Sequence, residues 1–119
     1  MVLEKFYIKK KEERVSSVIT TLGPFELREP DYAEMQTWSK EHELDLKDAD
    51  LPTQTALLLS SFSTNDEIRG ADMESLVKDC RNDFTQGDLL AFVEWFSVLN
   101  GGNLEIVHNI INSKNPKMR

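Results

Sequence analysis

The chain has 119 residues, of which 39% are hydrophobic and 29% are charged, a composition that is usual for one globular domain. Its formal net charge is −7, and residues 26–94 carry 17 acidic but only 6 basic side chains. An acidic body repels nucleic-acid phosphates, and no apolar run is long enough to cross a bilayer, so neither nucleic acid nor membrane is an expected partner. The single cysteine excludes an intrachain disulfide, and no apolar signal segment follows Met1, so we expect a cytoplasmic protein.

The first thirty residues favour β-strands. Residues 6–8 and 15–22 are rich in β-branched and aromatic side chains, and a polar stretch over residues 9–14 separates them. Gly23-Pro24 then interrupts the second run, and a short alternating segment resumes over residues 25–27. We therefore predict an antiparallel hairpin whose loop is residues 9–14 and whose second arm is broken or bulged at Gly23-Pro24.

The sequence after residue 29 favours helices. The first helix is predicted from Pro30 to about residue 42, because proline suits the first helical position. An acidic connector is expected over residues 43–50, and a second helix begins at Pro52 and carries apolar side chains as far as Phe62. Residues 63–71 contain turn-forming side chains, which indicates a turn or a single helical turn.

Three more helices complete the prediction. One starts near Asp72 and places Cys80 on its apolar face, where a buried structural thiol is expected. Another has Thr85 as its N-cap, with Asp88 three residues later, and its apolar stripe ends at Asn100-Gly101-Gly102. A fifth helix is predicted over residues 103–112. The fold class is α+β, an N-terminal antiparallel β-hairpin followed by a bundle of four to five short helices, with one domain over residues 1–113 and a flexible basic tail over residues 114–119.

No motif for catalysis or for cofactor or metal binding is visible. The two histidines lie 66 positions apart, and no serine or cysteine stands in a glycine-flanked turn of the kind that nucleophilic enzymes use. The acidic stretch over residues 43–50 lacks the central glycine of a calcium loop. We therefore expect a protein that is not an enzyme and that has no cofactor.

Aromatic side chains are the more informative feature. Phe84, Phe92, Trp95 and Phe96 crowd a short stretch, and the helical wheel places Trp95 at the edge of the core stripe. Two interpretations stay open: Trp95 packs in the core, or it joins a surface that recognises an amphipathic partner helix. The candidate partner-binding residues are Trp38, Phe84, Trp95 and Val98.

The order of elements resembles the tail assembly chaperones of long-tailed bacteriophages. These small acidic proteins often show a hairpin that ends in a leucine, arginine, charged residue, proline step, which is Leu27-Arg28-Glu29-Pro30 here, followed by a helical bundle. The segment from Asp83 to Leu90 resembles the entry to the family's last helix. The resemblance covers residues 15–101, whereas Gly23-Pro24 and residues 103–119 depart from the family pattern.

The resemblance implies a role in the host bacterium's cytoplasm. Family members bind the tape measure protein, keep this long helical chain soluble and help to recruit tail tube subunits, so both are implied partners. A homo-oligomer is also implied, because family members can assemble into rings or spirals. Two alternatives remain: a generic acidic helical adaptor or regulator, and an acidic mimic of DNA, for which the acids show no evident phosphate-like array.

Overall fold

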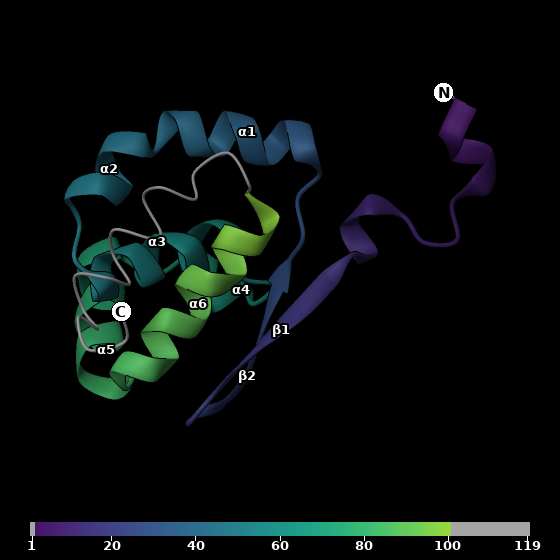
Figure 1. Cartoon of the computed structure of the whole chain (residues 1–119). Coiled ribbons are helices and arrows are strands. Elements are labelled where there is room, and N and C mark those ends of the chain that lie inside the picture. The colour runs from purple at the N-terminus through teal and green to yellow at the C-terminus, as the bar shows by residue number, and fades with distance from the viewer. Residues whose placement is uncertain (1, 101–119) are drawn as a thin grey trace, which may run out of the picture.

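The computed structural model describes residues 2–100, in which a two-stranded antiparallel hairpin is followed by six α-helices (Figure 1). This arrangement confirms the predicted α+β class with its N-terminal hairpin. Short 3-10 helices, Val2–Phe6 and Lys11–Glu13, precede the hairpin. The other elements are β1 Val15–Thr20, β2 Gly23–Arg28, α1 Tyr32–Glu41, α2 Glu43–Asp48, α3 Leu51–Phe62, α4 Asp66–Arg69, α5 Met73–Asp83 and α6 Gln86–Leu99.

The hairpin uses different residues from those predicted. Residues 6–8 are not a strand, and residues 9–14 are not its loop; β1 instead pairs with β2 around a tight turn at Thr21 and Leu22. Gly23-Pro24 therefore opens the second strand and does not interrupt it. Gly23 has a φ of +118°, a conformation that glycine adopts without the steric cost that a Cβ would bring.

Asp88 of α6 holds this turn in place. Its Oδ1 accepts a hydrogen bond from the Thr21 backbone N–H at 2.9 Å, and its Oδ2 accepts one from the Thr21 hydroxyl at 2.6 Å. The same carboxylate accepts the Thr85 N–H at 3.0 Å, while the Asp88 N–H donates to the Thr85 hydroxyl at 3.1 Å. Asp88 thus completes the predicted N-terminal cap of α6 and also fixes the hairpin turn to the bundle.

The first helical segment also differs in detail. Asp31, not Pro30, begins α1 as its N-cap, because the Asp31 carboxylate accepts the Glu34 N–H at 2.8 Å. The predicted acidic connector over residues 43–50 contains the short helix α2. Leu46 of α2 is buried, and the Gln54 side chain donates to the backbone carbonyl of Leu46 at 2.6 Å, which satisfies the end of that helix.

The core lies between α3 and the elements that surround it. α3 packs against α5, α6 and α4 and touches β2, and its start at Leu51 with Pro52 in the first turn agrees with the prediction. α4 is the expected single helical turn. Buried side chains from nearly every element meet at this centre: Val18, Leu27, Met35, Leu46, Leu51, Ala56, Leu58, Leu59, Phe62, Leu76, Cys80, Leu89, Phe92, Val93 and Phe96.

The two later helices follow the prediction closely. Asp72 caps α5, and Thr85 caps α6 with a capping box that includes Asp88. α6 ends at Leu99, and buried Asn100 follows as its C-cap. The predicted helix over residues 103–112 and the predicted tail over residues 114–119 lie outside the described residues.

Cys80 is buried in α5, as expected for a structural thiol. Burial raises the pKa of the Cys80 thiol to about 12, and the nearby carboxylates of Asp79 and Asp83 act in the same direction. Because the thiolate is the reactive form, we expect the folded chain to react with an aromatic disulfide reagent at pH 8 at least about 100-fold more slowly than the unfolded chain. Absorbance of the released thiol, followed with and without urea, measures this ratio. Comparable rates would show that α5 opens readily.

Candidate functional site

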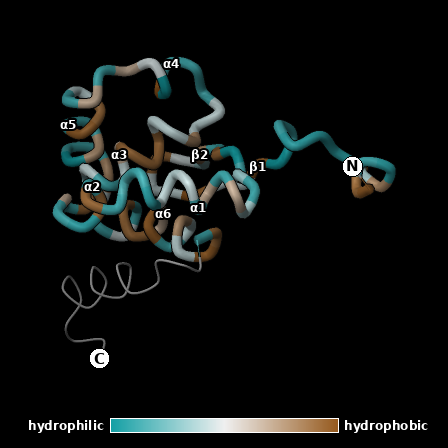
Figure 2. Tube along the Cα trace, turned by 90° about the horizontal axis from the view of Figure 1, so that it is seen from above, coloured by the Kyte–Doolittle hydropathy of each residue, from teal (hydrophilic) through white to brown (hydrophobic). Residues whose placement is uncertain are grey.

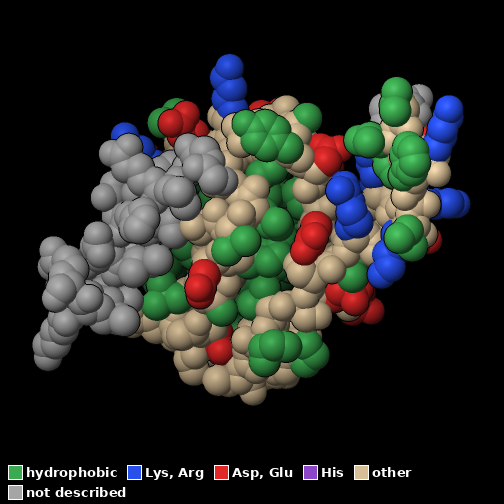
Figure 3. Space-filling model, turned by 45° about the vertical axis from the view of Figure 1, so that its right-hand side comes forward, with side chains coloured by type: hydrophobic (Ala, Val, Ile, Leu, Met, Phe, Trp, Pro, Cys, Tyr) green, Lys and Arg blue, Asp and Glu red, His purple; other side chains and the backbone are tan. Residues whose placement is uncertain are grey.

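An apolar groove lies between β1 and α6. It has a volume of about 420 Å³, and one wall is a helical face formed by Ala91, Glu94, Trp95 and Val98. These positions fall at i, i+3, i+4 and i+7, so their side chains share one side of α6. The opposite wall is β1 from Ser16 to Ile19. Seen from this side, a band of hydrophobic side chains runs across the body with acidic side chains beside it (Figure 3).

The outer edge of β1 opens into this groove. Arg14 and Glu29 are a hydrogen-bonded pair of the ladder, since the Glu29 N–H donates to the Arg14 carbonyl at 2.9 Å. Such pairs alternate along an antiparallel ladder, so Val15, Ser17 and Ile19 direct their backbone N–H and C=O groups away from β2. Within the described part of the chain, β1 has β2 as its strand partner and no second one.

The outer edge of β2, in contrast, is covered. Leu27 forms an isolated antiparallel bridge with Ser63, and the Thr64 N–H donates to the Glu26 carbonyl at 3.2 Å. As far as residues 2–100 show, the small sheet therefore has one open edge, that of β1. An open strand edge is a ready template for pairing with another chain.

Trp95 packs against the core and also lines the groove. The indole N–H donates to the Ser16 hydroxyl at 2.6 Å, and the ring lies 5.5 Å from the ring of buried Phe62. Its side chain is half-buried, and the part that remains accessible lines the groove. Val98, which lies one turn further along α6, is 77% exposed. The structure thus brings Trp95 and Val98 together in one site.

Trp38 and Phe84 lie apart from this groove. Trp38 packs on Phe62 from the α1 side at 5.1 Å, and its other side lines a separate hollow of about 430 Å³ along α1, beside Thr37 and Glu41. Phe84 is half-buried, and its ring meets Phe25 edge-on at 5.3 Å. Trp38 and Trp95 therefore approach the same core ring from different elements, but they do not form one surface.

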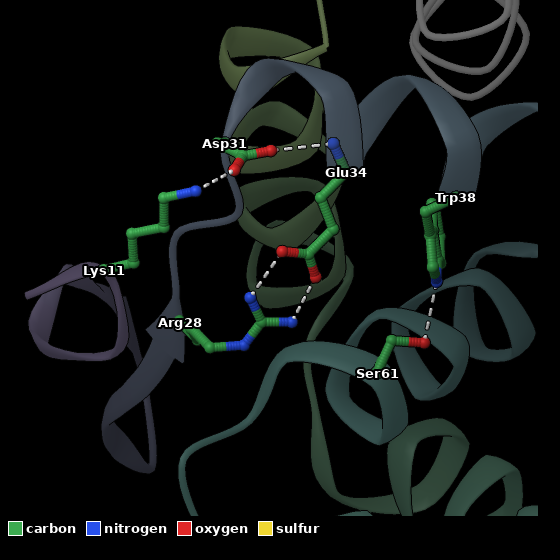
Figure 4. A network of polar contacts seen from close by, with 6 residues as sticks. All are labelled: Lys11, Arg28, Asp31, Glu34, Trp38 and Ser61. Atoms are coloured by element: carbon green, nitrogen blue, oxygen red, sulfur yellow. Dashed lines mark hydrogen bonds and ion pairs between the residues drawn. The ribbon is translucent and has the colours of Figure 1, made fainter. Parts of the chain in front are cut away.

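A polar network fixes α1 to the hairpin (Figure 4). Arg28 at the end of β2 donates two hydrogen bonds to the Glu34 carboxylate, at 3.0 and 2.6 Å. The bidentate contact with Glu34 raises the pKa of the Arg28 guanidinium. Lys11, which precedes β1, donates to the Asp31 carboxylate at 3.2 Å. The chain is thereby anchored to the body at residue 11, and residues 2–10 lie beyond that anchor.

Residues 2–10 form what we call the N-terminal arm, and it projects away from the body in both views of the trace (Figures 1 and 2). It carries large apolar side chains that the body does not bury: Phe6 is 73% exposed and Ile8 is 98% exposed. Lys5, Lys9 and Lys10 make the arm basic. Exposed apolar side chains gathered on one segment are a feature that interaction surfaces share.

Sequence reasoning missed the strand half of the groove. Ile19 is 71% exposed and Glu29 adds a carboxylate to the lining, yet neither was singled out from the pattern. The available signal was the alternation of exposed Val15, Ser17 and Ile19 with inward Ser16, Val18 and Thr20 along β1. This alternation indicates part of a groove only when β1 is known to be an edge strand with an open outer side.

The described residues show neither a metal site nor a membrane-spanning helix. Among residues 2–100, no group of three or more histidine, cysteine, aspartate or glutamate side chains is placed to hold a metal ion. The described helices include none that combines the length and the apolar character needed to cross a membrane. Compared with models of protein families, with curated proteins and with solved structures, the chain shows no significant match.

Proposed function

We propose that this chain is a protein-binding module whose client docks in the groove between β1 and α6. The observation that carries the proposal is the combination of an apolar wall at Trp95 and Val98 with the open edge of β1. Amphipathic helices and extended segments both bind surfaces of this kind, the first through side chains and the second through added strand pairing. In either case the client must present a stripe of apolar side chains to the groove.

The client that we propose is the tape measure protein of a long-tailed bacteriophage. The support is the resemblance at Leu27-Arg28-Glu29-Pro30 and in the segment from Asp83 to Leu90. A very long helical chain exposes apolar surface that aggregates. Many chaperone copies, each covering one stretch, would keep it soluble, and the net charge of −7 would make coated complexes repel one another. The bacterial host cytoplasm is the corresponding location, and the tail tube protein is a further proposed partner.

Coexpression with a tape measure fragment from the same phage genome tests the proposal. We expect the fragment to stay soluble and to be recovered with the tagged chain at micromolar concentrations. Val98→Arg should weaken this complex at least about tenfold, because a guanidinium replaces an exposed apolar contact on the α6 wall of the groove. Isothermal titration with the purified fragment measures the change.

Leu44→Arg is the matched control. Leu44 of α2 is 73% exposed, close to the 77% of Val98, but it does not line the groove. The same substitution there should leave the affinity unchanged. Equal losses in both variants would assign the effect to charge alone, and a fragment that is never recovered would remove the tape measure protein as client. A generic adaptor would instead bind a single globular partner with the same groove.

A further inference from the structure

The N-terminal arm and the groove have matching properties. The arm presents Phe6 and Ile8 almost fully to solvent, while the groove presents the apolar side chains of Val98 and Ile19. Residues 2–14 carry five basic and three acidic side chains, whereas residues 15–100 carry six basic and 17 acidic ones. Two of these acids, Glu29 and Glu94, line the groove itself. The arm and the groove therefore both offer apolar side chains, and their charges are opposite in sign.

The local sequence of the arm supports the same pairing. Phe6, Tyr7 and Ile8 are strong strand formers, yet they form no strand within the described chain. Among residues 2–100, no strand pairs with the open edge of β1. A disagreement between local preference and observed structure often marks a functional contact. Addition of residues 6–8 to the edge of β1 would satisfy both the arm and the edge.

The chain's own arm is poorly placed to reach its own groove. It projects away from the body (Figures 1 and 2), and the short 3-10 helix Lys11–Glu13 at its base fixes this direction. The Glu13 N–H donates to the Lys10 carbonyl at 3.0 Å, and the Arg14 N–H donates to the Lys11 carbonyl at 3.2 Å. The ion pair between Lys11 and Asp31 then holds the base of the arm against the body. An arm from another molecule has no such constraint.

We infer that the N-terminal arm of one copy occupies the β1–α6 groove of a second copy. Phe6 and Ile8 pack against the α6 wall, and the lysines of the arm face Glu29 and Glu94. Reciprocal exchange of two arms closes a dimer, whereas one-way exchange continues into longer assemblies. The same groove then serves either a second copy or the proposed client, so the arm competes with the client for it.

Mass measurement of the purified full chain tests this inference. We expect light-scattering chromatography to give a mass of at least two chains at about 100 μM, a high concentration chosen because a contact made by one short segment is small and therefore weak. The double variant Phe6→Ser/Ile8→Ser and the single variant Val98→Arg should each run as the 13.7 kDa monomer. Leu44→Arg should keep the wild-type mass. A monomeric wild-type chain, or an assembly that survives both variants, would overturn the inference.

Mixing the two monomeric variants gives the sharper result. The Phe6→Ser/Ile8→Ser chain keeps an intact groove and the Val98→Arg chain keeps an intact arm, so an equimolar mixture should associate again. An arm that folded back on its own groove would leave the mixture monomeric and would contradict exchange between copies. Glu94→Lys should weaken association about tenfold, and a second change, Lys9→Glu/Lys10→Glu, should restore it if the charges face one another.

The outcome is separable from that of the proposed function. Association is measured without any client, and client binding is measured with the Phe6→Ser/Ile8→Ser chain, whose groove is free. A variant that captures the tape measure fragment although the wild-type chain is monomeric would leave the function standing without the exchange. The reverse result would leave the exchange standing without that client.

Discussion

Replacement of Phe92 by alanine is expected to lower the free energy of unfolding by about 3–5 kcal/mol. The Phe92 side chain is 0% exposed, and its ring meets those of Phe25 at 5.9 Å and Phe84 at 5.5 Å. Alanine would remove these contacts and leave a cavity where β2, the start of α6 and the end of α5 converge, because a packed core closes only partly around a lost ring. Urea denaturation followed by circular dichroism measures the loss.

Val98→Ala is the control for that measurement, since Val98 lies on the same helix but is 77% exposed. Its unfolding free energy should change by less than about 0.5 kcal/mol. If Phe92→Ala were as mild as Val98→Ala, Phe92 would not be packed in the core, and another face of α6 would meet the hairpin. The α6 wall of the groove depends on the same helix orientation, so it would then consist of other residues.

Removal of the Asp88 carboxylate is expected to cost about 2–3 kcal/mol at pH 7. The carboxylate accepts the Thr21 N–H, the Thr21 hydroxyl and the Thr85 N–H, so Asp88→Ala leaves three donors without this partner. The loss acts at two places, because it frays the start of α6 and frees the hairpin turn that lies 67 positions away in the sequence. Asp79→Ala, on the exposed face of α5, is the matched control and should change stability by less than about 0.5 kcal/mol.

The contribution of Asp88 should depend on pH. Burial of the carboxyl acts to raise its pKa, but the hydrogen bonds from Thr21 and Thr85 outweigh burial and hold the pKa below the usual aspartate value. A group with a lowered pKa in the folded state stabilises the fold above its unfolded pKa, about 3.9, and loses that contribution as the pH falls through the folded value. The stability gap between wild type and Asp88→Ala should therefore be constant from pH 7 to pH 5 and shrink below about pH 4.

Urea denaturation of both chains at several pH values between 3 and 7 measures this gap. Asp31 and Asp50 also have pKa values lowered by backbone and side-chain hydrogen bonds, but they are present in both chains and cancel in the difference. A gap that widens on acidification would mean that Asp88 is protonated in the native state. A protonated Asp88 carboxyl would itself donate one hydrogen bond, so donor and acceptor would be exchanged between Asp88 and the Thr21 hydroxyl.

The sequence singled out residues on the helix side of the groove only. Helical spacing places Trp95 at the edge of the core stripe, and Trp95 and the other candidate on this helix, Val98, both line the groove. Trp38 and Phe84, the other two aromatic candidates, lie elsewhere: Trp38 lines a hollow along α1, and Phe84 packs against Phe25. Spacing along one helix can be read locally, whereas the position of one helix relative to another depends on how the whole core packs.

The amino-acid sequence by itself determined the helices that have strong local signals. Asp72 and Thr85 cap their helices with side chains that lie within three residues of the N–H groups they satisfy, and the apolar stripe of α6 repeats at helical spacing. Such signals act over one turn, so no distant contact is needed to predict them. The α+β class follows from the order of β-rich and helical segments in the same way.

Tertiary structure alone decided where the hairpin turns, that α2 is helical and that β1 keeps an open edge. The turn at Thr21 is held by Asp88, and α2 is completed by Leu46 in the core and by the Gln54 side chain at its end. Each of these partners lies outside the segment whose structure it selects. Residues 6–8 show the same principle in reverse. Their local preference is for a strand, but in the described part of the chain they pair with no strand edge and form none.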